Sequence, residues 1–270
     1  MQQTGPAVVF QQQIGELALR IRIQQALTLG ALSAIVAVSW YFLIETEAAM
    51  RVTRGDDFFI ALMTMMMRPS AVVPYLGATV LMWVVMMIAM MVPVAMPMLV
   101  VFRKLDRDVG ARFDTLLFTA GYLLSWCGFS LAAAVLQWLL HSAQWLGGDL
   151  LSARPLLAAA IMVTAGLYQL TPLKAACLDK CRSPMGYFLA NWRDGRWGAV
   201  AMGLHHGLFC IACCWMLMLI MFVGGAMSVM TMALLSSFIL AERLLPAGPW
   251  LTHLPGVGLI AWGGYIAVVA

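Results

Sequence analysis

Charged side chains are scarce in this sequence. Asp, Glu, Lys and Arg together make up 10% of the 270 residues, whereas 63% of the residues are hydrophobic. Soluble domains contain about 25% charged residues, so this chain lacks the polar surface that would keep it in water. The scarcity excludes a soluble domain and predicts that the lipid bilayer covers most of the surface.

Several motifs of known function are absent as well. The chain has no Walker motif, nucleophile elbow or HExxH pattern, so hydrolytic or nucleotide-driven activity is not expected. No run of basic residues alternates with aromatic residues, so nucleic acid is not expected as a partner. The six cysteines are not spread as in a secreted disulfide framework. The first apolar run follows a polar leader, and we expect it to be an uncleaved span rather than a signal peptide.

What the chain does contain is a series of long apolar runs. A helix that crosses a bilayer needs about 20 residues, and the runs are continuous rather than alternating, which favours helices over a barrel. We therefore predict an all-α, polytopic transmembrane helical bundle that forms a single domain over residues 1–270. The seven predicted spans lie near residues 27–44, 76–101, 115–140, 153–173, 197–223, 226–244 and 251–269.

Three shorter segments carry predictions of their own. Residues 11–25 mix apolar side chains with Arg20 and Arg22, which is typical of an interfacial helix that leads into the first span. Residues 58–67 are apolar but too few to cross, so we expect an interfacial or re-entrant segment there. The Gly224-Gly225 pair predicts a tight turn between the fifth and sixth spans.

The distribution of Lys and Arg predicts the orientation of the bundle. With seven spans, twelve basic residues fall in the N-terminal segment and in the connections on its side, and four fall on the opposite side. Cytoplasmic loops carry an excess of Lys and Arg. We therefore predict a cytoplasmic N-terminus and a C-terminus outside.

One face of the fifth predicted span carries the most informative side chains. Each helical residue turns by about 100°, so residues spaced at i, i+4, i+8 and i+11 stack on one face. The residues at these positions are Met202, His206, Cys210 and Cys213, with Cys214 at the edge of the stripe. Gly203 and Gly207 lie beside the stripe and leave room for a neighbouring helix to approach closely.

Sulfur and imidazole donors on one stripe indicate a metal site. Thioether, thiol and imidazole ligands select copper(I) or zinc over magnesium or calcium. Burial penalises a lone thiolate, whereas a monovalent ion bound by one thiolate, or a divalent ion bound by two, is electrically neutral. Singly, a cysteine packs as a small apolar residue and a histidine bonds across helices. Together, His206, Cys210, Cys213 and Cys214 favour metal binding, because ionisable residues inside spans are functional by default.

Methionines are candidates for supporting donors. Met86, Met87, Met90 and Met91 lie in the second predicted span, and with Met202 they supply thioether sulfurs. Methionine at helical spacing is also a common plastic core residue, and the sequence leaves both readings open. Pro93 and Pro97 interrupt the hydrogen-bond ladder beside these methionines and predict a kink.

A second pair of cysteines follows the fourth predicted span. Cys177 and Cys181 are spaced at i and i+4, which places both thiols on one face if the segment is helical. The predicted orientation puts them at the cytoplasmic end, where thiols stay reduced, so a structural disulfide is not expected. A metal hand-off pair and a pair of inert interfacial cysteines both remain open.

A recognisable pattern runs through the fourth and fifth predicted spans and a methionine-rich part of the second. Its residues are Met86–Pro93, Tyr168, Thr171–Lys174, Cys177, Cys181–Pro184, Trp192, Arg193, Gly195, Gly198, Ala199, Met202, Gly203, His206, Gly207, Cys210 and Cys213–Trp215. Over residues 75–245, and above all over 168–221, the chain resembles a bacterial family of predicted metal-binding integral membrane proteins of unknown function. Ala212 departs from the family's glycine before the paired cysteines, although alanine is also small. The resemblance implies metal binding and a multi-pass location in the bacterial inner (cytoplasmic) membrane.

These observations lead to one favoured hypothesis and two alternatives. We favour a non-enzymatic role: a membrane protein that binds a soft transition metal, copper(I) in the first place and zinc in the second. It would transport the ion or deliver it, with a metallochaperone or a membrane metalloenzyme as partner. The alternatives are a membrane oxidoreductase that uses thiols or a haem, and a non-catalytic assembly factor whose cysteines only pack.

Overall fold

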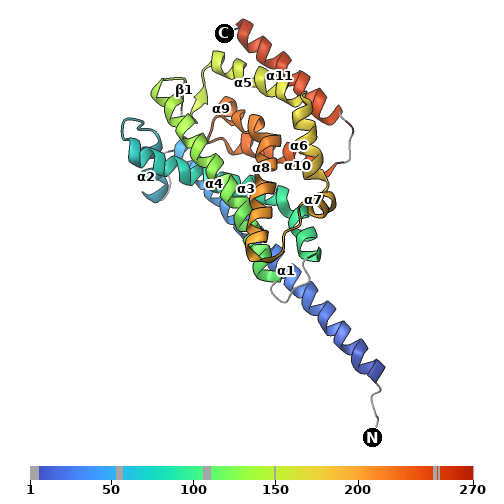
Figure 1. Ribbon diagram of the computed structural model, residues 1–270. Helices are drawn as coiled ribbons and strands as arrows, with labels where there is room; N and C mark the ends of the chain where they lie inside the picture. Colours follow the sequence, from blue (N-terminus) through green and yellow to red (C-terminus); the bar gives the residue numbers. More distant parts are fainter. Residues whose placement is uncertain are drawn as a thin grey trace.

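The computed structural model describes residues 6–52, 57–105, 111–148, 150–245, 248 and 250–269. This part of the chain is helical apart from one short antiparallel hairpin, in which Leu146 pairs with Ala153. The elements, in order, are α1 (Pro6–Val52), α2 (Asp57–Met66), α3 (Val72–Leu105), α4 (Ala111–Ser142), β1 (Leu146–Gly147), β2 (Ser152–Ala153), α5 (Pro155–Gln169), α6 (Pro172–Arg182), α7 (Pro184–Asn191), α8 (Gly195–Leu219), α9 (Met221–Gly224), α10 (Val229–Leu244) and α11 (Trp250–Val269) (Figure 1). The predicted all-α fold is confirmed.

Five described helical stretches are long and apolar enough to cross a membrane. They are Ala26–Ala49, Val72–Leu105, Phe113–Ser142, Gly195–Gly224 and Trp250–Val269. A sixth span results only if α5 and α6, which meet at an angle of 66°, count as one. The predicted number of seven spans is therefore not confirmed.

Two predicted spans do not form a single helix long enough to cross a membrane: one is broken, and the other is too short. The predicted span 153–173 stops at Gln169, because Pro172 disfavours helix in the residue before it. Thr171 instead caps the next helix, where its hydroxyl accepts a hydrogen bond from the Lys174 amide. The predicted span 226–244 contains the 16 residues of α10. At 1.5 Å per residue, α10 is about 24 Å long, less than the hydrocarbon thickness of about 30 Å.

The structure also describes the three shorter segments, residues 11–25, residues 58–67 and the Gly224-Gly225 pair. The backbone of residues 11–25 continues into the first span as part of the single helix α1, so no separate approach helix exists. Residues 58–66 make up all but the first residue of the ten-residue helix α2, whose Leu62 and Met66 are buried. Gly225 adopts a positive φ of 95° between α9 and α10, so the predicted tight turn is confirmed.

The closest helix contact joins α4 and α8, and glycines make it. A Cβ atom on Gly203 would collide with the backbone carbonyl of Phe118, and one on Gly207 would lie 2.5 Å from the Ser125 hydroxyl. That hydroxyl donates to the Leu204 carbonyl at 2.9 Å. The expected close approach beside the donor stripe is confirmed, and the neighbour is α4.

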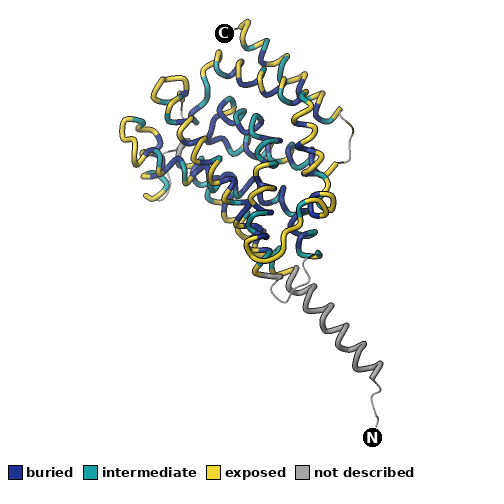
Figure 2. The backbone as a smooth tube through the Cα atoms, in the orientation of Figure 1, coloured by how far each residue is buried: buried dark blue, intermediate teal, exposed yellow. Residues whose placement is uncertain are grey.

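Burial is concentrated in the middle of the molecule. Figure 2 shows buried residues along α3, α8 and α9, whereas exposed residues predominate along α11. Large apolar side chains are exposed on α1, α4 and α11, including Val38, Leu124 and Trp262. Such a surface suits contact with lipid.

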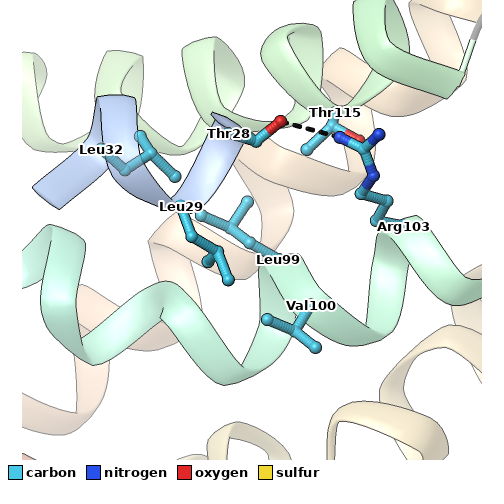
Figure 3. A pocket seen from close by; sticks show the side chains of 7 residues that line it. All are labelled: Thr28, Leu29, Leu32, Leu99, Val100, Arg103 and Thr115. Carbon is cyan, nitrogen blue, oxygen red and sulfur yellow. Dashed lines mark hydrogen bonds between the residues drawn. The ribbon is translucent and has the colours of Figure 1, made fainter. Parts of the chain in front are cut away.

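A small apolar cavity of about 50 Å³ lies where α1, α3 and α4 meet (Figure 3). Leu29 and Leu32 of α1 face Leu99 of α3 there. Arg103 donates to the Thr28 hydroxyl at 2.8 Å beside it, which ties α1 to α3. Among the described residues, no cysteine lines this cavity.

Replacing Gly203 by alanine tests the α4–α8 contact. Because a backbone carbonyl cannot move aside cheaply, the added methyl should destabilise the fold by about 1–3 kcal/mol. The measurement is the thermal unfolding midpoint in detergent. Gly128 of α4 has no neighbour within 4 Å of a Cβ position, so Gly128→Ala is the control and should be neutral or stabilising. Equal midpoints for both variants would contradict the contact.

Candidate metal centre

The five clustered cysteines share one buried region. Cys177 and Cys181 lie on α6, which contacts α8, and both are buried, as are Cys210, Cys213 and Cys214 of α8. The segment that carries Cys177 and Cys181 is helical, so their i and i+4 spacing places both thiols on one face of α6. The sequence suggested two separate groups of cysteines, but the bend at Pro172 brings α6 onto α8. We call these five residues the sulfur cluster.

The thiols of the sulfur cluster interact with one another across the two helices. The Cys181 and Cys213 side chains are within hydrogen-bonding reach, as are those of Cys213 and Cys214. The Cys213 and Cys214 thiols also donate to the Cys210 carbonyl, at 3.2 and 2.9 Å. Cys213 is therefore the point at which the α6 and α8 groups join.

A cation that the sequence analysis missed lies against the sulfur cluster. Arg243 of α10 is buried, and its Nη2 atom lies 2.9 Å from the Cys210 sulfur and 3.1 Å from the Cys213 sulfur. A guanidinium group stays charged in proteins, so its burial requires a nearby anion. The contacts therefore favour a thiolate at Cys210 or Cys213.

A buried ion pair adjoins Arg243 in sequence. The Lys174 ammonium group lies 2.9 Å from both carboxylate oxygens of Glu242, and the two side chains are 1% and 2% exposed. Gln169 bonds to both members of the pair. The Arg182 Nε group donates to the Glu242 carbonyl at 2.7 Å. These contacts fix the end of α10 against the corner between α5 and α6, and so position Arg243.

The buried charges alter the orientation argument. Lys174 and Arg243 were both counted as inner loop charges, yet both are buried in protein contacts. In the seven-span count, removing them leaves ten basic residues on the inner side against four on the other. With the five described stretches alone, Arg193 and Arg196 would fall on the opposite side. The orientation itself remains a prediction. The sequence did contain a signal for Lys174 and Arg243, because ionisable residues within or at the end of an apolar run indicate a functional site.

His206 is buried without a hydrogen-bond partner. It is 1% exposed, and in the described part of the chain neither ring nitrogen meets a donor or acceptor. Its ring stacks on Tyr122, at 5.7 Å between centroids, and meets the Tyr187 ring edge-on at 5.4 Å. Buried polar atoms are nearly always paired, so an unpaired imidazole indicates an absent ligand or water.

Tyr122 links His206 to the sulfur cluster. Its ring contacts the imidazole, while its hydroxyl lies 3.2 Å from the Cys210 sulfur. The same hydroxyl donates to the Met91 carbonyl of α3 at 3.1 Å. Tyr122 belongs to α4, so the close α4–α8 contact is what brings it to both residues. Nothing in the sequence pattern singled it out.

The structure separates the predicted methionine donors. Met86, Met87, Met90 and Met91 are buried in the same core region as the sulfur cluster. Met202 instead packs in a second core region with Phe118 and Tyr187. A ligand role for these thioethers remains a prediction.

The donor set suits copper(I) even though it is not a preformed chelate. Among the described residues, no three His, Cys, Asp or Glu side chains are arranged to hold a metal ion. Soft thiolates nonetheless select copper(I), and two of them next to Arg243 would leave a bound monovalent ion neutral overall. A zinc ion would need a third thiolate for the same balance. The residues therefore fit copper(I) better than zinc.

Replacing Lys174 by methionine tests the buried ion pair. The change leaves the Glu242 carboxylate buried without its counter-ion, which should cost about 3–5 kcal/mol of stability. The double variant Lys174→Met/Glu242→Gln removes both charges and should recover most of the loss. Thermal unfolding in detergent measures both effects. A single variant as stable as the unmodified protein would contradict the pairing.

The part of the chain that carries this site matches a known protein family. Residues 80–266, more than half of the chain, match the family described as PpoB2, copper chaperone. The matched range contains the sulfur cluster, Arg243 and the buried ion pair. No curated protein and no solved structure matches the chain. The donor chemistry and the family match agree, and this chain belongs to the PpoB2 copper chaperone family.

Proposed function

We propose that this protein is a membrane-embedded copper chaperone that holds copper(I) in the sulfur cluster and delivers it to a membrane-associated metalloprotein. The observation that carries the proposal is the position of Arg243 between the Cys210 and Cys213 sulfurs, at 2.9 and 3.1 Å. The family match supports copper as the cargo.

Charge balance explains how one buried site can be stable both without copper and with copper(I) bound. Without copper, the Arg243 guanidinium and one thiolate sum to zero, and the other thiol stays protonated. On loading, copper(I) enters, the second thiol loses its proton, and two thiolates balance the ion and the guanidinium. Metal binding to thiols releases protons in this way. One copper(I) ion thus replaces one proton, and the buried charge stays zero, which avoids the cost of an unpaired charge.

The arrangement of donors supports ligand exchange rather than permanent storage. We propose Cys210 and Cys213 as the main ligands, with Cys181 and Cys214 as exchange partners and Cys177 at the edge. His206 would serve as a neighbouring donor, because its nitrogens are unpaired. Met86, Met87, Met90 and Met91 would supply weaker thioethers. Since no rigid chelate is preformed, the ion can pass between donors without being trapped.

The five apolar stretches support a location in the bacterial inner membrane. If α5 and α6 together form one more span and the N-terminus is in the cytoplasm, α8 begins on the cytoplasmic side and the sulfur cluster lies inside the span. Delivery to a metalloenzyme within the same membrane requires no energy source beyond a tighter site on the partner.

One contact favours the thiol oxidoreductase alternative. Cys181 and Cys213 are close enough to interact, and an oxidant could join such a pair as a disulfide. Alkylation of the purified protein before and after exposure to an oxidised thiol would reveal it by mass. Reversible loss of two alkylation sites, confined to Cys181 and Cys213, would favour the redox role over copper delivery.

Serine substitutions test the copper site directly. The double variant Cys210→Ser/Cys213→Ser removes both sulfurs that contact Arg243, so its copper(I) affinity should fall by about 100-fold or more, since even supporting contacts are worth 10- to 100-fold. Metal analysis of the purified protein and competition with a copper(I) chelator measure the loss. Cys127, an exposed cysteine on α4, provides the control Cys127→Ser, which should bind normally. Copper binding that survives in the double variant would refute the site.

Arg243 provides a test of the charge argument. Arg243→Gln removes the cation, so the two-thiolate copper complex carries an uncompensated negative charge and its affinity should fall by about 10- to 100-fold, the range found for supporting groups. Arg243→Lys keeps the charge and should retain most of the affinity. Competition with a copper(I) chelator, together with the unfolding midpoint of each variant, separates binding from folding. A folded glutamine variant with unchanged affinity would rule out the charge argument.

A further inference from the structure

A cavity of about 240 Å³, with both polar and apolar residues in its lining, lies beside α7 and the first half of α8. Its lining includes Tyr187 and Asn191 of α7, Arg193 of the following turn, and Met202 and His205 of α8. Neither the family description nor the sulfur cluster accounts for it. The cavity is much larger than the apolar one beside α1 and is lined by groups that bind ions or anions.

Only one layer of side chains separates this cavity from the unpaired His206. Tyr187 lines the cavity, and its ring also contacts the His206 ring. Its hydroxyl donates to the Met202 carbonyl at 2.7 Å and lies 3.2 Å from Nδ1 of His205. Burial raises the pKa of Tyr187 above its usual range, so the hydroxyl stays protonated and keeps this bond. The cavity therefore ends at the first donors of the stripe that leads to Cys210.

The charge at the mouth of the cavity is positive. Arg193 lines it and is exposed. Lys180 does not line it but lies over the Phe209 ring at 4.3 Å, and that ring contacts the lining residue His205. Both charges act on His205, which lines the cavity. Among the described residues, no carboxylate lines it; Asp114 and Asp194 line a separate, smaller pocket that Arg193 also lines. A bare copper cation would be repelled at this mouth, whereas an anionic ligand would be attracted.

We infer that copper(I) reaches the protein as an anionic complex with a small carboxylate-bearing thiol, and that the complex docks in this cavity. This inference rests on the proposed function. The bond between copper and the carrier sulfur breaks as a bond to a protein donor forms, first at Met202 or His206 and then in the sulfur cluster. The carrier thiolate that leaves takes the proton that a protein thiol loses. Copper keeps its oxidation state, and both charge and protons balance.

Loading kinetics of the full chain in detergent test the inference. Copper(I) is presented to the reduced, metal-free protein as its anionic glutathione complex or as its cationic acetonitrile complex. The rate is followed by the ultraviolet absorbance of the copper–thiolate bond. The glutathione complex should load faster in the unmodified protein at low salt, and the advantage should shrink as salt screens the charges.

Variants of the rim supply the matched comparison. Lys180→Gln/Arg193→Gln should slow loading from the glutathione complex by about tenfold or more, the low end of electrostatic rate enhancement. It should not slow loading from the acetonitrile complex. Arg196 stacks on Phe113 at 4.9 Å and does not line the cavity, so Arg196→Gln should load at the unmodified rate. Copper content at equilibrium should be the same in all three proteins.

The outcomes separate this inference from the proposed function. If the rim variant loads from glutathione as fast as the unmodified protein, or if salt has no effect on that rate, the inference is overturned while copper binding stands. If neither complex loads the unmodified protein, the proposed function fails, and the inference fails with it.

Discussion

A permanent positive charge inside the protein is the constraint on which the rest of the structure depends. Arg243 is buried near the end of α10, and its guanidinium group cannot release its proton. The atoms found beside it are the sulfurs of Cys210 and Cys213. The neighbouring Glu242 is neutralised by Lys174, so Arg243 is left to the thiols. A buried cation thus makes thiolates stable where hydrocarbon would otherwise keep them protonated.

Helix packing delivers the remaining groups to this charge. Gly203 and Gly207 let α4 approach α8, so that Tyr122 reaches both His206 and the Cys210 sulfur. The bend before Pro172 turns α6 onto α8 and brings Cys181 to Cys213. The donors therefore come from separate helices, α6 and α8, with Arg243 supplied by α10. Such a site can adjust its sulfurs around a passing ion, which suits delivery better than storage.

The sequence predicted the helical class, the close approach beside Gly203 and the helix that carries Cys210 and Cys213, because helical periodicity and residue size are local properties. It could not predict that Cys181 would join Cys213, because that depends on the 66° bend between α5 and α6. It counted Lys174 and Arg243 among the solvent-facing charges at the ends of spans, because an apolar run does not show whether the charge that ends it contacts water or a buried partner. The predicted seven spans are not confirmed, in part because α10 is apolar but only 16 residues long. Which donors hold the metal, and the orientation, remain predictions.

X-ray absorption at the copper edge of the copper(I)-loaded protein tests the central claim most directly, because it reports the atoms bonded to the ion. The account predicts a low-coordinate copper(I) ion whose nearest shell is dominated by sulfur, with at most one nitrogen from His206. A shell of nitrogen and oxygen atoms without sulfur would place the ion elsewhere and would contradict the role assigned to Arg243 and its two thiolates.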